Sequence, residues 1–117
     1  MDNNESILVS IKKLLGLPEE YEQFDTDVMV GINTAFMTLN QLGVGPSKGF
    51  SISDKTTTWS DYLPEGSDLE GVKSYIHLSV KLLFDPPQSS TLMESINRQI
   101  NMLEFRLNVN ADKGEEG

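Results

Sequence analysis

The stretch KLLFDPPQSS, from Lys81 to Ser90, joins two apolar segments through two consecutive prolines. A proline has no backbone N–H and its ring clashes with the preceding helical turn, so a helix entering this stretch must end before Pro86. A second apolar segment with helical spacing begins directly after the prolines. The sequence therefore predicts a helical hairpin that turns sharply at this corner.

Apolar residues elsewhere recur three and four positions apart, which is typical of helices that bury one face. The expected helices cover about residues 7–15, 26–42, 68–84 and 92–109, and Gly16 and Gly43 end the first two. The expected N-terminal caps of the last three helices are Asp25, Ser67 and Thr91.

The segment 44–66 between the second and third expected helices has a different pattern. Phe50 and Ile52 alternate with polar residues, and Asp54-Lys55 could form a turn, which is a weak hairpin signal. We expect Trp59, Tyr62 and Leu63 to anchor the returning end of this segment in the core. The predicted fold class is mainly α, a small bundle of about four helices with a long loop or weak β-hairpin between helices two and three.

The third expected helix is apolar on two sides, which an ordinary surface helix is not. It is either central in its own fold or also in contact with a neighbouring subunit. One stripe contains Leu69, Val72, Ile76, Val80 and Leu83, and the other contains Tyr75, Leu78 and Leu82. The remaining polar face carries basic side chains four positions apart, which form either a docking line for carboxylates or a solvated face. The candidate subunit-interface residues are Tyr75, Leu78, Leu82, Lys73, His77 and Lys81.

Composition limits the function classes. The chain has 117 residues, enough for one domain, and a net charge of −9, which argues against tight nucleic-acid binding. Residues 1–70 carry 12 acidic and 4 basic side chains, whereas residues 71–109 carry 3 and 4. The apolar stretches are too short to span a membrane, and the N-terminus lacks a basic signal-peptide region. We therefore expect a soluble protein made in the cytoplasm, with no membrane partner.

Catalytic and metal-binding signatures are sparse. The chain has no cysteine, and its single histidine, His77, lies between lysines on a predicted helix. GVGPSKG, residues 43–49, follows a helix and not a strand, which favours a turn over a phosphate-binding loop. We expect no catalytic residues, no metal site and no cofactor, so an enzyme ranks last among the hypotheses.

Five stretches in order, ILVSIKKLLGL, FDTDVMVGINTAFMTLNQLGVGP, TTWSDYL, LEGVKSYIHLSVKLLFDPP and INRQINMLEFRLNV, resemble the small head-to-tail connector proteins of tailed bacteriophages, also called adaptor or head-completion proteins. The resemblance covers about residues 6–109. It implies a mostly helical subunit without a catalytic site, assembled in the host cytoplasm into the neck of the virion. It also implies a ring, expected to be a dodecamer, that docks beneath the portal protein, offers a platform to a stopper or tail-completion protein, and lets DNA pass without specific binding.

The resemblance also suggests contact residues. Residues 1–109 form the expected helical connector domain, and residues 110–117 an acidic tail that we expect to be flexible because it has little to bury. Residues 108–117 are a candidate portal arm, and the loop 44–58 is a candidate contact to the next ring or the neighbouring subunit. The portal-contact candidates are Phe105, Arg106, Asn108, Val109 and Asn110, and the loop-contact candidates are Phe50, Ile52, Asp54 and Lys55. The alternative is a small helical protein-binding or regulatory module encoded by a prophage.

Overall fold

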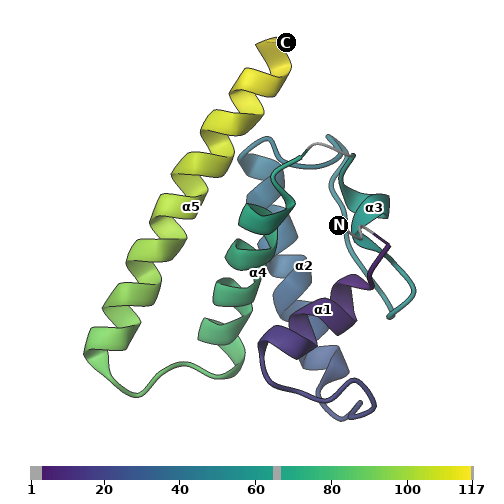
Figure 1. Cartoon of the computed structure of the whole chain (residues 1–117), viewed down its shortest axis with the longest axis vertical. Coiled ribbons are helices and arrows are strands. Elements are labelled where there is room, and N and C mark those ends of the chain that lie inside the picture. The colour runs from purple at the N-terminus through teal and green to yellow at the C-terminus, as the bar shows by residue number, and fades with distance from the viewer. Residues whose placement is uncertain (1–3, 65–66, 117) are drawn as a thin grey trace.

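A computed structural model describes residues 4–64 and 67–116 of the chain, with side chains described as far as residue 111. Within these residues the fold is mainly helical, which confirms the predicted fold class (Figure 1). The predicted hairpin is also confirmed, because α4 ends at Phe84 and α5 begins at Ser90. The helices are α1 (Ile7–Leu14), α2 (Asp25–Gln41), α3 (Trp59–Tyr62), α4 (Leu69–Phe84) and α5 (Ser90–Glu116).

Helix α4 lies at the centre of the fold and contacts α1, α2 and α5. On one side, Gly31 of α2 lets Val80 approach so closely that an added Cβ would lie 3.3 Å from its Cγ2 atom. On another side, the Tyr75 hydroxyl donates a 2.8 Å hydrogen bond to Glu104 of α5. Burial and this carboxylate raise the pKa of Tyr75 to about 12. The buried residues on the two sides of α4 are therefore covered by its own chain.

One member of the predicted buried stripe lies outside the core. Leu83 is 66% exposed, in contrast to the expectation. At this end of α4 it is Phe84 that faces the body of the protein, where its ring packs edge-on against Phe24 with centroids 5.1 Å apart. Because Phe24 precedes α2 and Phe84 ends α4, this contact also shows that the two helices run antiparallel.

Three expected helix caps were wrong by one or two residues. Phe24 occupies the cap position of α2, and Asp25 is the first helical residue. Asp68, not Ser67, caps α4 by accepting a hydrogen bond from the Gly71 amide. Ser89 accepts from the Leu92 amide and starts α5 earlier than Thr91 would. At α4 and α5 several adjacent residues can cap the helix, so the choice among them depends on the path by which the chain arrives.

Asp25 instead forms an ion pair inside the protein. The Nζ atom of Lys12 lies 2.7 Å from an Asp25 carboxylate oxygen, and the Lys12 side chain is only 2% exposed. The same ammonium donates to the backbone carbonyls of Glu19, at 3.0 Å, and Tyr21, at 2.7 Å. Lys12 therefore ties α1, the 15–24 connection and the start of α2 together.

The connection 44–58 is a loop, and the hairpin alternative is wrong within the described residues. Its only ladder contact is an isolated bridge between Ser6 and Thr58. The Asn33 side chain of α2 binds both backbone groups of Ile52, at 2.9 and 2.8 Å, as a neighbouring strand would. A side-chain amide thus satisfies the backbone that the sequence pattern assigned to a strand.

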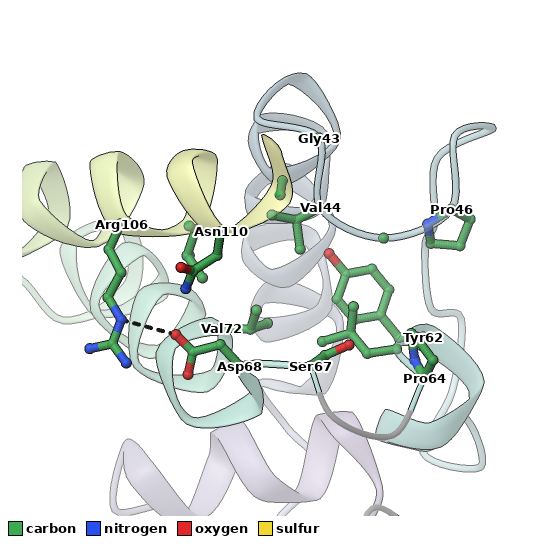
Figure 2. Close-up of a pocket in the computed structure, with 14 residues that line it drawn as sticks. Gly43, Val44, Pro46, Tyr62, Pro64, Ser67, Asp68, Val72, Arg106 and Asn110 are labelled. Carbon is green, nitrogen blue, oxygen red and sulfur yellow. Dashed lines mark ion pairs between the residues drawn. The ribbon is translucent and has the colours of Figure 1, made fainter. Parts of the chain in front are cut away.

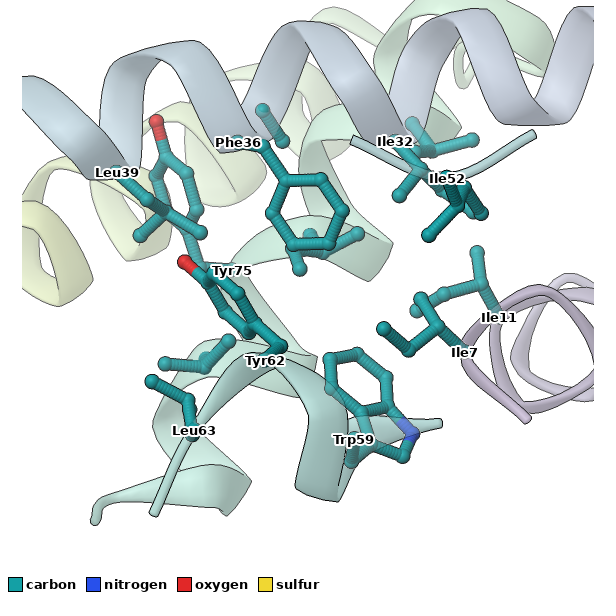
Figure 3. Close-up of a cluster of buried hydrophobic side chains, with 14 of the residues drawn as sticks. Ile7, Ile11, Ile32, Phe36, Leu39, Ile52, Trp59, Tyr62, Leu63 and Tyr75 are labelled. Carbon is teal, nitrogen blue, oxygen red and sulfur yellow. The ribbon is translucent and has the colours of Figure 1, made fainter. Parts of the chain in front are cut away.

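Side chains of the short helix α3, which was not expected from the sequence, complete the core between α1, α2 and α4 (Figure 3). Thr58 and Asp61 form a capping box at its start. The anchoring roles predicted for Trp59, Tyr62 and Leu63 are confirmed, since all three are buried. The Trp59 indole donates to the Ser10 hydroxyl at 3.0 Å, which joins α3 to α1.

Helix α5 continues past the expected end of the helical domain. The backbone of residues 110–116 is helical, where the sequence analysis placed a tail. In Figure 1 this end of α5 extends beyond the ends of α2 and α4. The flexibility expected of the acidic segment, and the division into a domain and a tail, stay predictions.

Candidate interaction surfaces

The outer face of α5 carries large apolar side chains that the chain itself does not cover. Met102 is 71% exposed and Phe105 is 73% exposed. Arg98, one turn before Met102, is exposed on the same face. The opposite face of α5 is buried through Ile96 and Leu107. We call Arg98, Met102 and Phe105 the α5 outer face.

A second exposed apolar face lies on α2. Val30 is 60% exposed and Met37 is 70% exposed, seven residues apart and therefore on one side of the helix. Asp27 and Thr34 are exposed on the same side. Neither apolar residue was among the contact candidates identified from the sequence. We call Asp27, Val30, Thr34 and Met37 the α2 outer face.

A cleft of about 980 Å³ lies between the end of α5, the turn after α2, α3 and the start of α4 (Figure 2). The Arg106 guanidinium bridges it, with Nε 3.1 Å from an Asp68 carboxylate oxygen. Tyr62 lines the cleft, and its buried hydroxyl has no hydrogen-bond partner among the described residues. Burial raises the pKa of this hydroxyl. An added Cβ on Gly45 would lie 2.5 Å from the Tyr62 ring, so the turn needs glycine there.

The portal-contact candidates divide between the body and the surface. Arg106 pairs with Asp68, and the Asn108 amide donates to the Leu42 carbonyl at 3.1 Å, so both tie α5 to the body. Val109 is half-buried, whereas Phe105 and Asn110 are exposed.

The expected basic line on α4 is divided in the same way. Lys73 lies 3.5 Å from Glu5 and 5.6 Å from the Trp59 ring centroid, so it belongs to the body of the protein. Lys81 lies 3.6 Å from Asp85 on its own helix. Tyr75 is buried in the core, and the half-buried His77, Leu78 and Leu82 remain at the surface. His77 and Leu78 line a second groove, of about 890 Å³, with Met102, Leu103 and Arg106 of α5.

The environment of His77 makes the stability of the folded state depend on pH. Burial and the nearby Lys81 charge hold the pKa of His77 below its ordinary value. In the unfolded chain the pKa of His77 is about 6.5. As the pH falls, the unfolded chain therefore binds the proton before the folded chain does. The folded state loses stability from about pH 6.5 downward. Urea midpoints at pH 7.5 and 5.5 should differ less for His77→Gln than for the wild type. An unchanged difference would contradict this prediction. Glu5 does not contribute to the difference between pH 7.5 and pH 5.5, because its pKa is lowered from its usual 4.5.

The loop-contact candidates also have different surroundings. Ile52 is buried and Phe50 packs edge-on against Phe36, with centroids 5.3 Å apart, so both serve the core. Asp54 and Lys55 are exposed. Asp54 accepts hydrogen bonds from the backbone and the hydroxyl of Thr56, and these bonds lower its pKa.

The described residues contain no group of three or more His, Asp or Glu side chains that could hold a metal ion. In the same part of the chain, no helix combines the length and the apolar character that a membrane span requires. Outward-facing apolar helix surfaces on a small helical body are typical of the class of proteins that act by contact with other proteins.

The comparison with known families agrees with this class. A family model described as phage connector protein matches residues 7–114, so the chain belongs to the phage connector protein family. Neither the curated proteins nor the solved structures give a significant match. The resemblance seen in the sequence is confirmed, and the protein has a connector-type structural role in the phage virion.

Proposed function

We propose that this protein is a ring adaptor, expected to be a dodecamer, which sits between the portal and the stopper or tail of a tailed phage. The observation that carries the proposal is the pair of exposed apolar faces, on α2 and on α5, in a chain of the phage connector family. Unlike faces that meet head to tail generate a closed ring when the rotation between copies closes.

The end of α5 is the proposed portal contact. It extends beyond the rest of the body in Figure 1, and Asn110 presents an exposed side chain on it. Hydrogen bonding of Asn108 to Leu42 and the Arg106–Asp68 ion pair fix the direction in which the helix leaves the body. The exposed loop residues Asp54 and Lys55 are the proposed contacts to the next ring or the neighbouring subunit.

The charge of the chain suits a channel for DNA. A net charge of −9 on each subunit provides little neutralisation of DNA phosphates, which is the main source of nonspecific affinity. A duplex therefore passes through the proposed ring without being held. The proposal contains no catalytic step and no cofactor.

The test combines the purified chain with the portal protein of the same phage. Negative-stain images and native mass spectrometry should show twelve-fold rings seated on the portal. A variant that lacks residues 112–117 should fold but lose at least tenfold in portal affinity, because the proposed arm is shortened. Glu20→Lys, on the exposed connection before α2, changes the net charge by the same amount; it is the matched control and should keep portal binding. A chain that stays monomeric with the portal and is absent from purified virions would contradict the proposal and favour a regulatory module.

A further inference from the structure

We propose that the occupant of the α5 outer face is the α2 outer face of a second copy of this chain. In this contact Phe105 packs against Met37, Met102 packs beside Thr34, and the Arg98 guanidinium pairs with Asp27. The inference rests on the proposed ring and adds the residues through which its copies meet.

Helices α2 and α5 of one chain point in the same direction. Helices α2 and α4 are antiparallel, and the hairpin makes α4 and α5 antiparallel, so α2 and α5 run in the same direction (Figure 1). The Asn108–Leu42 hydrogen bond places the C-terminal end of α2 level with residue 108 of α5. A copy placed beside the first by a small rotation about an axis along the helices keeps both directions. It therefore brings α5 of one copy alongside α2 of the next in parallel.

A single chain covers neither the α2 outer face nor the α5 outer face. Helix α4 packs between α2 and α5, and the outer faces are the sides of these two helices opposite their buried residues. The large apolar side chains of the two faces are 60–73% exposed, so they lack the burial that stabilises apolar residues. Two unlike faces on one molecule match the head-to-tail contact that a ring repeats.

The residues of the two faces also match in register along the helices. If residues 42 and 108 are level, Met37 is level with residue 103, between Met102 and Phe105. A shift of two residues, about 3 Å at 1.5 Å per residue, sets Phe105 opposite Met37 and Arg98 opposite Val30. Asp27 then lies one turn below Arg98. Long side chains on helices lean toward the N-terminus, so the Arg98 side chain leans toward Asp27.

Opposite charges lie on the two outer faces. Among the described residues Arg98 forms no ion pair, although Glu94 lies four residues earlier on the same helix. Asp27 is likewise exposed and forms no ion pair. It is the only charge on the α2 outer face. The opposite charges at matching ends of the two faces favour the parallel register over the antiparallel one, in which Arg98 would lie away from Asp27.

The test uses the absence of cysteine from the natural chain. Met37→Cys and Phe105→Cys chains are prepared separately, mixed in equal amounts with and without portal, and oxidised. A disulfide needs Cα atoms within about 7 Å. We expect the mixture to yield a covalent dimer that either single variant alone does not yield. The double variant should yield a ladder of covalent oligomers.

Several outcomes would overturn the inference. Dimers of Met37→Cys alone or of Phe105→Cys alone would show like faces meeting. Cross-linking of either cysteine to a cysteine-bearing portal would assign the face to the portal, and no cross-link in either condition would remove the contact. Rings on the portal without the mixed dimer would sink this interface and leave the proposed function standing. Mixed dimers without rings on the portal would support this interface and contradict the proposed function.

A charge exchange provides an independent measurement without cysteine. Arg98→Asp should weaken self-association at low salt at least tenfold, and Asp27→Arg should do the same. The double variant, which restores opposite charges, should recover most of the association. Arg106→Asp does not serve as a control because it breaks a contact within the chain, so Glu20→Arg, on the exposed connection before α2, is the matched control for the charge reversal at Asp27. Failure of the double variant to recover association would contradict the Arg98–Asp27 pairing.

Discussion

Lys12→Ala is expected to lower the free energy of unfolding by about 3–5 kcal/mol, the usual cost of removing one partner of a buried ion pair. The substitution leaves the Asp25 carboxylate without its cation and two backbone carbonyls, those of Glu19 and Tyr21, without their donor. Domains of this size are stable by only about 5–15 kcal/mol. A large fraction of the chains should therefore be unfolded under mild denaturing conditions.

The measurement is urea unfolding followed by circular dichroism, with Lys13→Ala as the control. Lys13 is the neighbouring residue with the same side chain, but it is exposed, and its contact to Glu5 spans 3.7 Å at the surface. Its loss should cost less than about 1 kcal/mol. The double variant Lys12→Met/Asp25→Asn, which removes both charges, should recover part of the stability. Equal effects of the Lys12 and Lys13 variants would contradict the role given to the buried pair.

Trp59→Ala should destabilise the protein by about 3–5 kcal/mol, as expected for a large buried aromatic side chain replaced by alanine. The ring is fully buried and joins α3 to α1 through its hydrogen bond to Ser10. Ser10 in turn donates to Glu5 at 2.7 Å, and this bond, with the nearby Lys73 and Lys13, holds the pKa of Glu5 below its usual value. The cavity would therefore also release the segment that precedes α1.

Two further variants separate packing from hydrogen bonding. Trp59→Phe keeps much of the packing and removes the indole N–H, so it should cost less than the alanine variant. Phe105→Ala removes an aromatic ring that is 73% exposed and should change the folding free energy by no more than about 0.5 kcal/mol. Thermal unfolding by circular dichroism ranks the three. Equal destabilisation by the Trp59 and Phe105 alanine variants would contradict the assignment of Trp59 to the core and Phe105 to a contact surface.

Part of the candidate site was evident in the sequence. Phe105 was among the contact candidates identified from the sequence, and it is exposed. Met102, Val30 and Met37 are also exposed, but no role was assigned to them from the sequence. For the candidates on α4, periodicity identifies a two-sided helix without identifying what covers each side, and their role in a subunit interface stays a prediction. Tyr75 faces Glu104 of the same chain, and Lys73 faces Glu5.

The sequence by itself determined where the chain turns and which faces of its helices are apolar. Pro86 and Pro87 end α4 by removing backbone donors, and helical periodicity depends on residues three and four apart, so neighbouring residues suffice for both. Only the tertiary structure decided which polar groups are buried and how they are paired. Lys12 and Lys13 are identical neighbours, yet one is buried against Asp25 and the other exposed, because the approach of α2 to α1 is set by contacts between residues distant in sequence. Asn33 replaces a strand partner for Ile52 for the same reason.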